Sequence, residues 1–101
     1  MAKYLIEVPH KRDVASCANA AQVFLSSGSH FLSNADWGCM DGHCSAWFVA
    51  DVESKEDARQ LVPPVFRKDA VVVGLNKFSM PQVGRLLREH ERAVTQAEAK
   101  V

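Results

Sequence analysis

At 101 residues the chain is about one domain long, and 48% hydrophobic with 24% charged residues is the composition of a globular protein. Twelve basic and twelve acidic residues leave no net charge, which argues against long-range attraction to nucleic acid or to an anionic membrane. No apolar run approaches the roughly 20 residues of a membrane-spanning helix, and the N-terminal segment does not have the form of a signal peptide. Three cysteines are too few for a disulfide framework. We therefore expect one cytoplasmic domain with no membrane or nucleic-acid partner.

The first two predicted elements are a strand and a helix. Residues 3–8 alternate as a half-buried strand does, and Pro9 ends this pattern. Asp13 is a good helix N-cap, and the apolar residues that follow lie on one helical face. Gly28 has the position that favours the end of a helix.

Residues 29–52 predict two strands joined by a tight turn, with 29–36 as the first and most polar of the two. Asp41-Gly42 favours a two-residue turn, which would place Cys39 opposite Cys44, whereas a longer loop would shift that pairing. This stretch holds both tryptophans, two of the three cysteines and two of the four histidines. We therefore expect the chemistry of the protein here.

The second half of the chain predicts two more helices and one more strand. Ser54 and Asp57 have the spacing of a capping box, and Pro63-Pro64 breaks the helix that they open. Residues 70–78 are rich in valine and predict a strand. Ser79 and Gln82 form a second capping box, which opens a long helix to about residue 99.

This order of elements, β-α-β-β-α-β and a final helix, most simply gives a ferredoxin-like α+β fold. Right-handed crossovers then give an antiparallel sheet of strand order 4-1-3-2 with both helices on one face. Residues 1–79 would form this domain, and residues 80–101 would be a helix that packs on the domain or on a partner subunit.

Alternation sorts the strand residues into two faces. The face toward the helices is predicted to carry Tyr4, Ile6, Val8, Phe31, Ala35, Ala46, Phe48, Ala50, Val52, Val71, Val73 and Leu75. The open face is predicted to carry Leu5, Glu7, His30, Leu32, Asn34, Ser45, Trp47, Val49, Asp51, Val72, Gly74, Asn76 and Phe78.

An open face of this composition is too apolar to remain in water. Face-to-face packing of a second copy would cover it. The other candidate is the C-terminal helix, whose apolar stripe is Val83, Leu87, His90, Val94 and Ala97, and which has the spacing to clasp a partner subunit instead. We favour a homodimer.

In its element order and its apolar open face the chain resembles the dimeric α+β-barrel superfamily. Within this superfamily, the chain is similar in element order to muconolactone isomerases and antibiotic-biosynthesis-type monooxygenases. The resemblance covers the whole β-α-β-β-α-β unit, and it implies a ligand cavity between the open sheet face and the helices or the partner. No catalytic motif matches residue by residue, so no active site is carried over.

The open face supplies the first candidate site. Glu7 lies among apolar neighbours that would raise its pKa, and His30 is the second candidate general base. The ligand-binding candidates are Leu5, Asn34, Trp47, Asp51, Asn76 and Phe78. Alternatively, these polar side chains pair with one another or with the partner subunit.

The turn supplies a second candidate site, for a transition metal. One rim of the sheet collects Glu7, His10, Asn34, Asp36 and His43, with Cys39, Met40 and Asp41 in the turn. Cysteine, histidine and carboxylate are donors for zinc, nickel, copper or iron, and we take Cys39, His43 and Asp36 as candidate ligands. No standard zinc spacing is present. The alternative is that Cys44 is a small core residue, Cys39 a partly exposed thiol and His43 a surface residue. Cys17 falls on the apolar face of the first helix, which favours a structural role.

Three functions remain open from the sequence. The first is a homodimer that binds a small molecule, or a transition metal, on its open face. The second is a cofactor-free isomerase or monooxygenase-type enzyme that uses Glu7 or His30 as general base. The third is a dimerisation module without a ligand.

Overall fold

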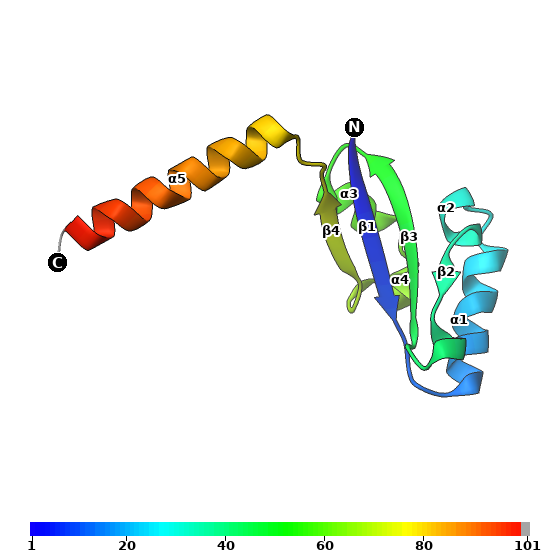
Figure 1. Cartoon of the computed structure of the whole chain (residues 1–101). Helices are drawn as coiled ribbons and strands as arrows, with labels where there is room; N and C mark the ends of the chain where they lie inside the picture. Colours follow the sequence, from blue (N-terminus) through cyan, green and yellow to red (C-terminus); the bar gives the residue numbers. More distant parts are fainter. Residues whose placement is uncertain (100–101) are drawn as a thin grey trace.

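The computed structural model describes the backbone of residues 1–99 and the side chains of residues 1–95. Figure 1 shows one antiparallel sheet, a layer of short helices and a long final helix that stands apart. The elements are β1 (Ala2–Pro9), α1 (Val14–Ser26), α2 (His30–Ser33), β2 (Asp36–Trp37), the 3-10 turn η1 (Cys39–Asp41), β3 (Ser45–Val52), α3 (Lys55–Gln60), α4 (Pro64–Arg67), β4 (Val71–Leu75) and α5 (Met80–Ala99).

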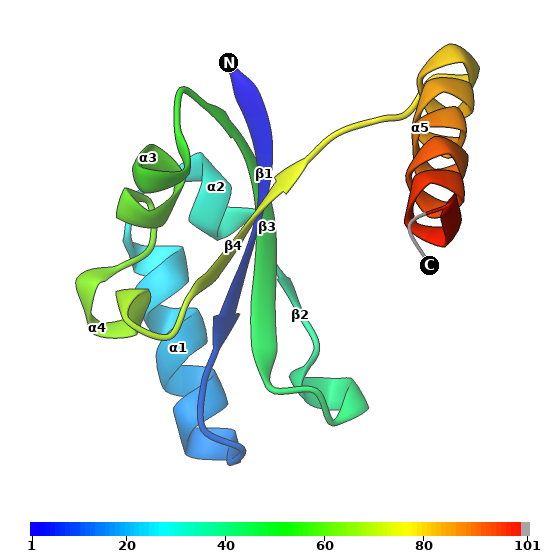
Figure 2. The same ribbon diagram turned by 90° about the vertical axis from the view of Figure 1, so that its left-hand side faces the viewer.

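The sheet is antiparallel throughout, with the strand order β2-β3-β1-β4. Counted from its other edge, this order has the neighbours of 4-1-3-2. β1 is central, because Ile6 pairs with Phe48 of β3 on one side and with Val72 of β4 on the other. Helices α1 to α4 lie together on one face of the sheet (Figure 2), so the architecture is compatible with a ferredoxin-like α+β fold.

Helices begin where capping residues predict. The Asp13 carboxylate accepts from the backbone N–H of Ser16 at 2.7 Å, and the Ser54 hydroxyl accepts from that of Asp57 at 3.1 Å. At the start of α5 the Ser79 N–H donates to the Gln82 side chain at 3.0 Å, and the Gln82 N–H donates back to the Ser79 hydroxyl at 3.3 Å. These local bonds satisfy N–H groups that would otherwise lack partners.

The core centres on Phe24 of α1, which is fully buried. Its ring meets those of Trp37, Phe48 and Phe66 edge-on, with centroids 5.0, 6.5 and 6.1 Å away. Three other segments, β2, β3 and α4, thereby pack against α1. Edge-on aromatic pairs of this kind add stability beyond the burial of their area.

The predicted second strand over residues 29–36 is wrong. Ser29 instead caps the short helix α2, with its hydroxyl accepting from the Leu32 N–H, and only Asp36 and Trp37 pair with β3. Leu32 is buried rather than on the open face. His30 and Asn34 leave the sheet and are exposed, and the Asn34 amide donates to the His30 carbonyl at 2.8 Å. A helical turn buries Leu32 against the core, which outweighs the alternation of this segment.

The predicted facing of the last strand is also wrong. Val72 is buried, whereas Val71, Val73 and Leu75 are 50%, 44% and 39% exposed on the open face. Three successive valines carry no alternation, so the sequence does not fix which of them faces inward. Pairing decides it, because Val72 stands opposite the buried Ile6. Asn76 and Phe78 lie beyond β4, in the exposed link to α5.

The long helix α5 extends away from the sheet, on the side that α1 to α4 leave open (Figure 2). The radius of gyration is 19.2 Å, against about 13 Å for a compact domain of 100 residues. Whether this helix packs on the domain or on a partner therefore stays a prediction. Within residues 1–99, no helix is both long and apolar enough to cross a membrane. The side chain of Ala97 and residues 100–101, which the sequence places in this helix, lie outside the described part.

Truncating Phe24 tests this core. Phe24→Ala removes the ring that joins α1 to β2, β3 and α4, and we expect it to lower the free energy of unfolding by about 3–5 kcal/mol. Leu25→Ala is the matched control, because Leu25 is 64% exposed on the same helix and should change stability little. Urea denaturation of both variants measures this, and an equal loss in the two would contradict the packing.

A candidate metal site of three cysteines and one histidine

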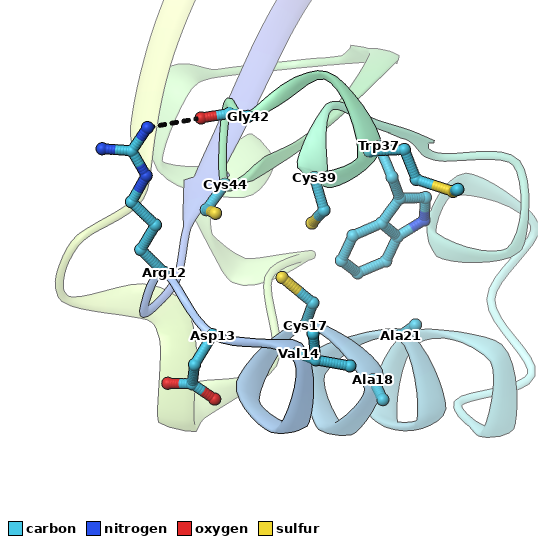
Figure 3. A pocket seen from close by; sticks show the side chains of 11 residues that line it. Arg12, Asp13, Val14, Cys17, Ala18, Ala21, Trp37, Cys39, Gly42 and Cys44 are labelled. Carbon is cyan, nitrogen blue, oxygen red and sulfur yellow. Dashed lines mark hydrogen bonds between the residues drawn. The ribbon is translucent and has the colours of Figure 1, made fainter.

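All three cysteines of the chain converge on one histidine. His10 follows β1, Cys17 lies in the first turns of α1, Cys39 begins η1 and Cys44 precedes β3. Figure 3 shows the three thiol groups directed toward one space between α1 and the hairpin loop. Residues far apart in the sequence thus form one group, which we call the Cys3His cluster.

The ligand atoms of the Cys3His cluster lie close together. His10 Nε2 is 3.1 Å from Cys17 Sγ and 2.9 Å from Cys39 Sγ. His10, Cys17 and Cys44 each place one ligand atom within 4.8 Å of the other two. In a tetrahedral zinc site with bonds of about 2.0–2.3 Å, ligand atoms are roughly 3.3–3.8 Å apart. The spacing of His10, Cys17 and Cys44 therefore fits one ion after small side-chain shifts. Cys39 is not part of that group of three, so its thiol, 2.9 Å from His10 Nε2, would have to move to become the fourth ligand.

Backbone hydrogen bonds hold the two halves of the cluster side by side. The His10 N–H donates to the Cys44 carbonyl at 3.1 Å, which ties the segment after β1 to the hairpin. The Asp13 cap starts α1 three residues later, and the first backbone bond of that helix, from Cys17 N–H to Asp13 C=O, is 3.0 Å long. Cys17 is thereby placed one turn into α1, facing the loop.

The hairpin loop is longer than a two-residue turn. Its connection runs from Gly38 to Cys44 and contains η1, and Gly42 ends η1 with φ of +82°. A Cβ on Gly38 would lie 2.6 Å from the His43 carbonyl oxygen and 2.8 Å from the Trp47 ring. Only glycine fits this closely approached position. The loop turns Cys39 and Cys44 toward α1 rather than pairing them across strands.

Burial and neighbouring thiols favour the protonated forms of Cys17 and Cys44 in the metal-free protein. A hydrogen bond with Cys39, followed by burial, raises the pKa of the Cys17 thiol. Burial, followed by a hydrogen bond with Cys17, raises the pKa of Cys44. The nearby Arg12 guanidinium acts in the opposite direction on the pKa of Cys44 and favours its thiolate. A bound cation would favour all three thiolates far more strongly.

The second ring nitrogen of His10 has no hydrogen-bond partner among the residues that the structure describes. His10 Nδ1 is buried without a hydrogen bond, while the ring lies 5.7 Å from that of Trp37. Buried polar atoms usually have a partner, and a histidine that binds a metal usually donates its second ring N–H to an acceptor. His10 lacks that contact within the described residues, and its ring is held by Trp37 and by the two sulfurs near Nε2.

A groove of about 660 Å³ opens beside the Cys3His cluster. Its walls are mainly apolar, and Figure 3 shows Arg12 and Asp13 at one end, Cys17 on the α1 side, and Cys39 and Cys44 on the loop side. The Arg12 guanidinium donates to the Gly42 carbonyl at 3.4 Å across this end. The groove gives an ion, or a thiol reagent, a path from solvent to the sulfurs.

The metal ligands predicted from the sequence do not come together. Of Cys39, His43 and Asp36, only Cys39 lies in the Cys3His cluster. His43 is on the open face, with Nε2 3.7 Å from Glu7 Oε2 and its ring 5.1 Å from that of Trp47. Asp36 pairs with Trp47 in the sheet and is exposed. Among the described side chains, the group with metal-ligand spacing is the one built on His10, Cys17 and Cys44.

Part of the predicted open-face site is assembled. Glu7 pairs with Trp47, and Leu5 pairs with Val49 one step along the same face. Glu7 Oε2 also accepts from the buried Ser45 hydroxyl at 3.0 Å. Asp51 lies near the other end of β3, opposite Lys3. The remaining candidates lie outside the sheet. His30 is the first residue of α2 and Asn34 follows that helix, whereas Asn76 and Phe78 follow β4.

The sequence did not predict Cys17 as a metal ligand. It placed His10 on the rim and Cys44 beside Cys39, but neither was among the predicted ligands Cys39, His43 and Asp36. Cys17 falls on the apolar face of α1, a pattern that usually indicates a core residue. The signal was the combination: His10 and Cys17 flank the start of one helix, and the chain brings both to the rim that holds the Cys39–Cys44 loop. No protein-family model, curated protein or solved structure matches this chain. The site is therefore interpreted from its own residues.

Alkylation of the metal-free protein tests the electrostatics. Raised pKa values leave Cys17 and Cys44 protonated at neutral pH, so both should react slowly with iodoacetamide until the pH exceeds the ordinary thiol value of 9.0. Peptide mass spectrometry across a pH series measures each rate. A midpoint at or below 9.0 for either cysteine would contradict the assigned environment.

Proposed function

We propose that this protein binds one transition-metal ion, of the zinc type, in the Cys3His cluster. The observation that carries this proposal is the convergence of every cysteine of the chain on the His10 ring. Three thiolates and one imidazole form one of the standard ligand sets of structural zinc. This convergence would be an unusual coincidence for cysteines that serve only as small core residues.

The donors favour zinc over harder cations. Thiolate ligands select zinc, copper(I) or iron–sulfur chemistry, whereas magnesium and calcium prefer oxygen ligands. Mixed sulfur and nitrogen donors in a tetrahedral arrangement are characteristic of zinc. A zinc ion supplies no reactive chemistry when the protein occupies all four of its coordination positions. Its role here would be to hold segments together.

The segments that the ion would join are the ones that shape this end of the molecule. His10 anchors the end of β1, Cys17 the start of α1, and Cys39 with Cys44 the hairpin loop. The adjoining groove of about 660 Å³ lies between α1 and that loop, and the three cysteines line it. An ion bound to these cysteines would hold α1 and the loop at a fixed distance and so fix the width of the groove. We therefore propose a metal-stabilised module whose groove presents a fixed, largely apolar surface.

We also propose that each chain forms one half of a dimeric α+β barrel, in which the open sheet face lines the interior. Support comes from Val49, Val71 and Val73, which are about half exposed on that face. Exposed patches of this kind usually mark an interface.

A small-molecule site on the open face is the second candidate function. It is favoured by the contact of Glu7 with Ser45 and by the nearness of His43 and Trp47. In an enzyme of this kind Glu7 would be the general base.

Metal content tests the main proposal. Protein purified without chelator should carry one metal ion per chain by elemental analysis. Cys17→Ser, Cys44→Ser and His10→Ala should each lose most of it, because each removes a ligand of a four-ligand site. Cobalt substitution should give the thiolate-to-cobalt charge-transfer band and the strong visible absorption of a tetrahedral site.

Two control positions, His43 and Asp36, lie on the open face of the sheet, away from the Cys3His cluster. His43→Ala and Asp36→Asn remove candidate ligands that the structure keeps away from the Cys3His cluster, so both variants should retain metal. Metal lost in these controls and kept in Cys17→Ser would favour the ligand set Cys39, His43 and Asp36. Metal absent from the unaltered protein, even after incubation with zinc, would overturn the proposal.

The two tryptophans separate the open-face candidate from the groove. Small aromatic compounds that bind the open face should shift the indole N–H resonance of Trp47 and leave that of Trp37, which lies on the helix face, unchanged. Glu7→Gln should keep the affinity of such a compound and abolish any proton-transfer turnover. Shifts confined to Trp37 would place the ligand in the groove instead.

A further inference from the structure

Helix α5 carries an apolar stripe that nothing in the described structure covers. Val83, Leu86, Leu87 and Val94 recur at helical spacing along one side, and the last three are 52%, 59% and 42% exposed. Arg85, Arg88 and Arg92 lie on the opposite side. In proteins most of the stability of a helix comes from packing of its apolar face on another surface. A helix with so defined a stripe therefore requires a surface to pack on.

The open sheet face is a second uncovered apolar surface of the same chain. Leu5 and Val49 pair across β1 and β3, and Leu5 also pairs with Val73 of β4. Val71 and Leu75 extend this patch along β4, and Val49, Val71, Val73 and Leu75 are all between 39% and 50% exposed. Unlike the face toward α1 to α4, it has no layer of helices (Figure 2).

The two surfaces match in length. α5 has 20 residues and β1 and β3 have 8 each, which correspond to about 30 Å of helix and about 26 Å of strand. The apolar stripe of one α5 can therefore run along the whole open sheet face of another copy, and an exchange of helices makes this contact twice in each dimer.

We infer that two copies of this chain exchange their C-terminal helices, each α5 packing its apolar stripe on the open sheet face of the other copy. This inference rests on the homodimer proposed above and names the element that forms it. The direction of α5 supports exchange. The helix lies on the open-face side yet projects past its own β4 edge rather than across its own sheet (Figures 1 and 2). A second copy therefore offers the surface that the helix can reach.

Paired variants test the exchange. Val73→Asp places a charge on the open face, and Leu87→Asp places one on the stripe of α5. Val73 is 44% exposed and Leu87 is 59% exposed in the single chain, so each variant should fold. Each alone should run as a monomer in size-exclusion chromatography with light scattering, whereas the unaltered full chain should run at twice the chain mass. Arg92→Asp, on the far side of α5, is the control and should remain a dimer.

Mixing the two variants is the decisive step. In the mixed dimer, the unaltered α5 of the Val73→Asp chain meets the unaltered sheet face of the Leu87→Asp chain, so one of the two contacts is intact. We expect dimer to reappear in the mixture and not in either variant alone. Sheets packed face to face, or two α5 helices packed on each other, would give no such recovery.

The other outcomes overturn the inference in distinguishable ways. A Leu87→Asp chain that remains dimeric would remove α5 from the interface and leave the proposed dimer standing. An unaltered chain that is monomeric at high micromolar concentration would overturn both the dimer and the exchange, and it would indicate that α5 folds back on its own sheet. Metal content, measured in the same samples, reports on the Cys3His cluster independently.

Discussion

The pairing of β1 with β3 and β4 is the constraint on which the rest of the structure depends. Because β1 is central, its alternation assigns both faces: Ile6 and Val8 enter the core, while Leu5 and Glu7 face the open side. The same register carries the chain to His10, whose N–H bonds to the Cys44 carbonyl. One strand thereby places the core, the open face and the histidine around which the cysteines gather.

A domain of this size has little stability to spare, since small domains bury a modest fraction of their surface. The buried core is a short set of side chains around Phe24 and Ile6, and none of the side chains of α5 that the structure describes belongs to it. A metal ion at one end and a second copy on the open face would each add stability without enlarging the core. The two devices act on opposite sides of the sheet, because the Cys3His cluster lies toward α1 and the apolar patch lies away from it.

Local signals in the sequence predicted much of this fold. The capping residues Asp13, Ser54 and Ser79 start helices where expected, and the alternation of β1 and β3 assigns their faces correctly. Two errors arose where local signals are weak. Residues 29–36 fit both a strand and a capped helical turn, and only the burial of Leu32 decides between them. The run Val71-Val72-Val73 has no alternation, so its facing depends on a partner strand far away in the sequence.

The candidate site was the least predictable part, for a physical reason. A metal site needs donor atoms that meet in space, and spacing along the chain reveals this only when all ligands share one or two local motifs. Here Cys17 lies on a helix, Cys39 and Cys44 on a loop, and His10 after a strand. Their meeting depends on the angle at which α1 leaves β1 and on the length of the hairpin loop. In this chain the fold, rather than a local motif, sets the distances between the donor atoms. Cysteines and histidines at the ends of elements that share one rim of the sheet therefore indicate a metal site better than their spacing along the sequence does.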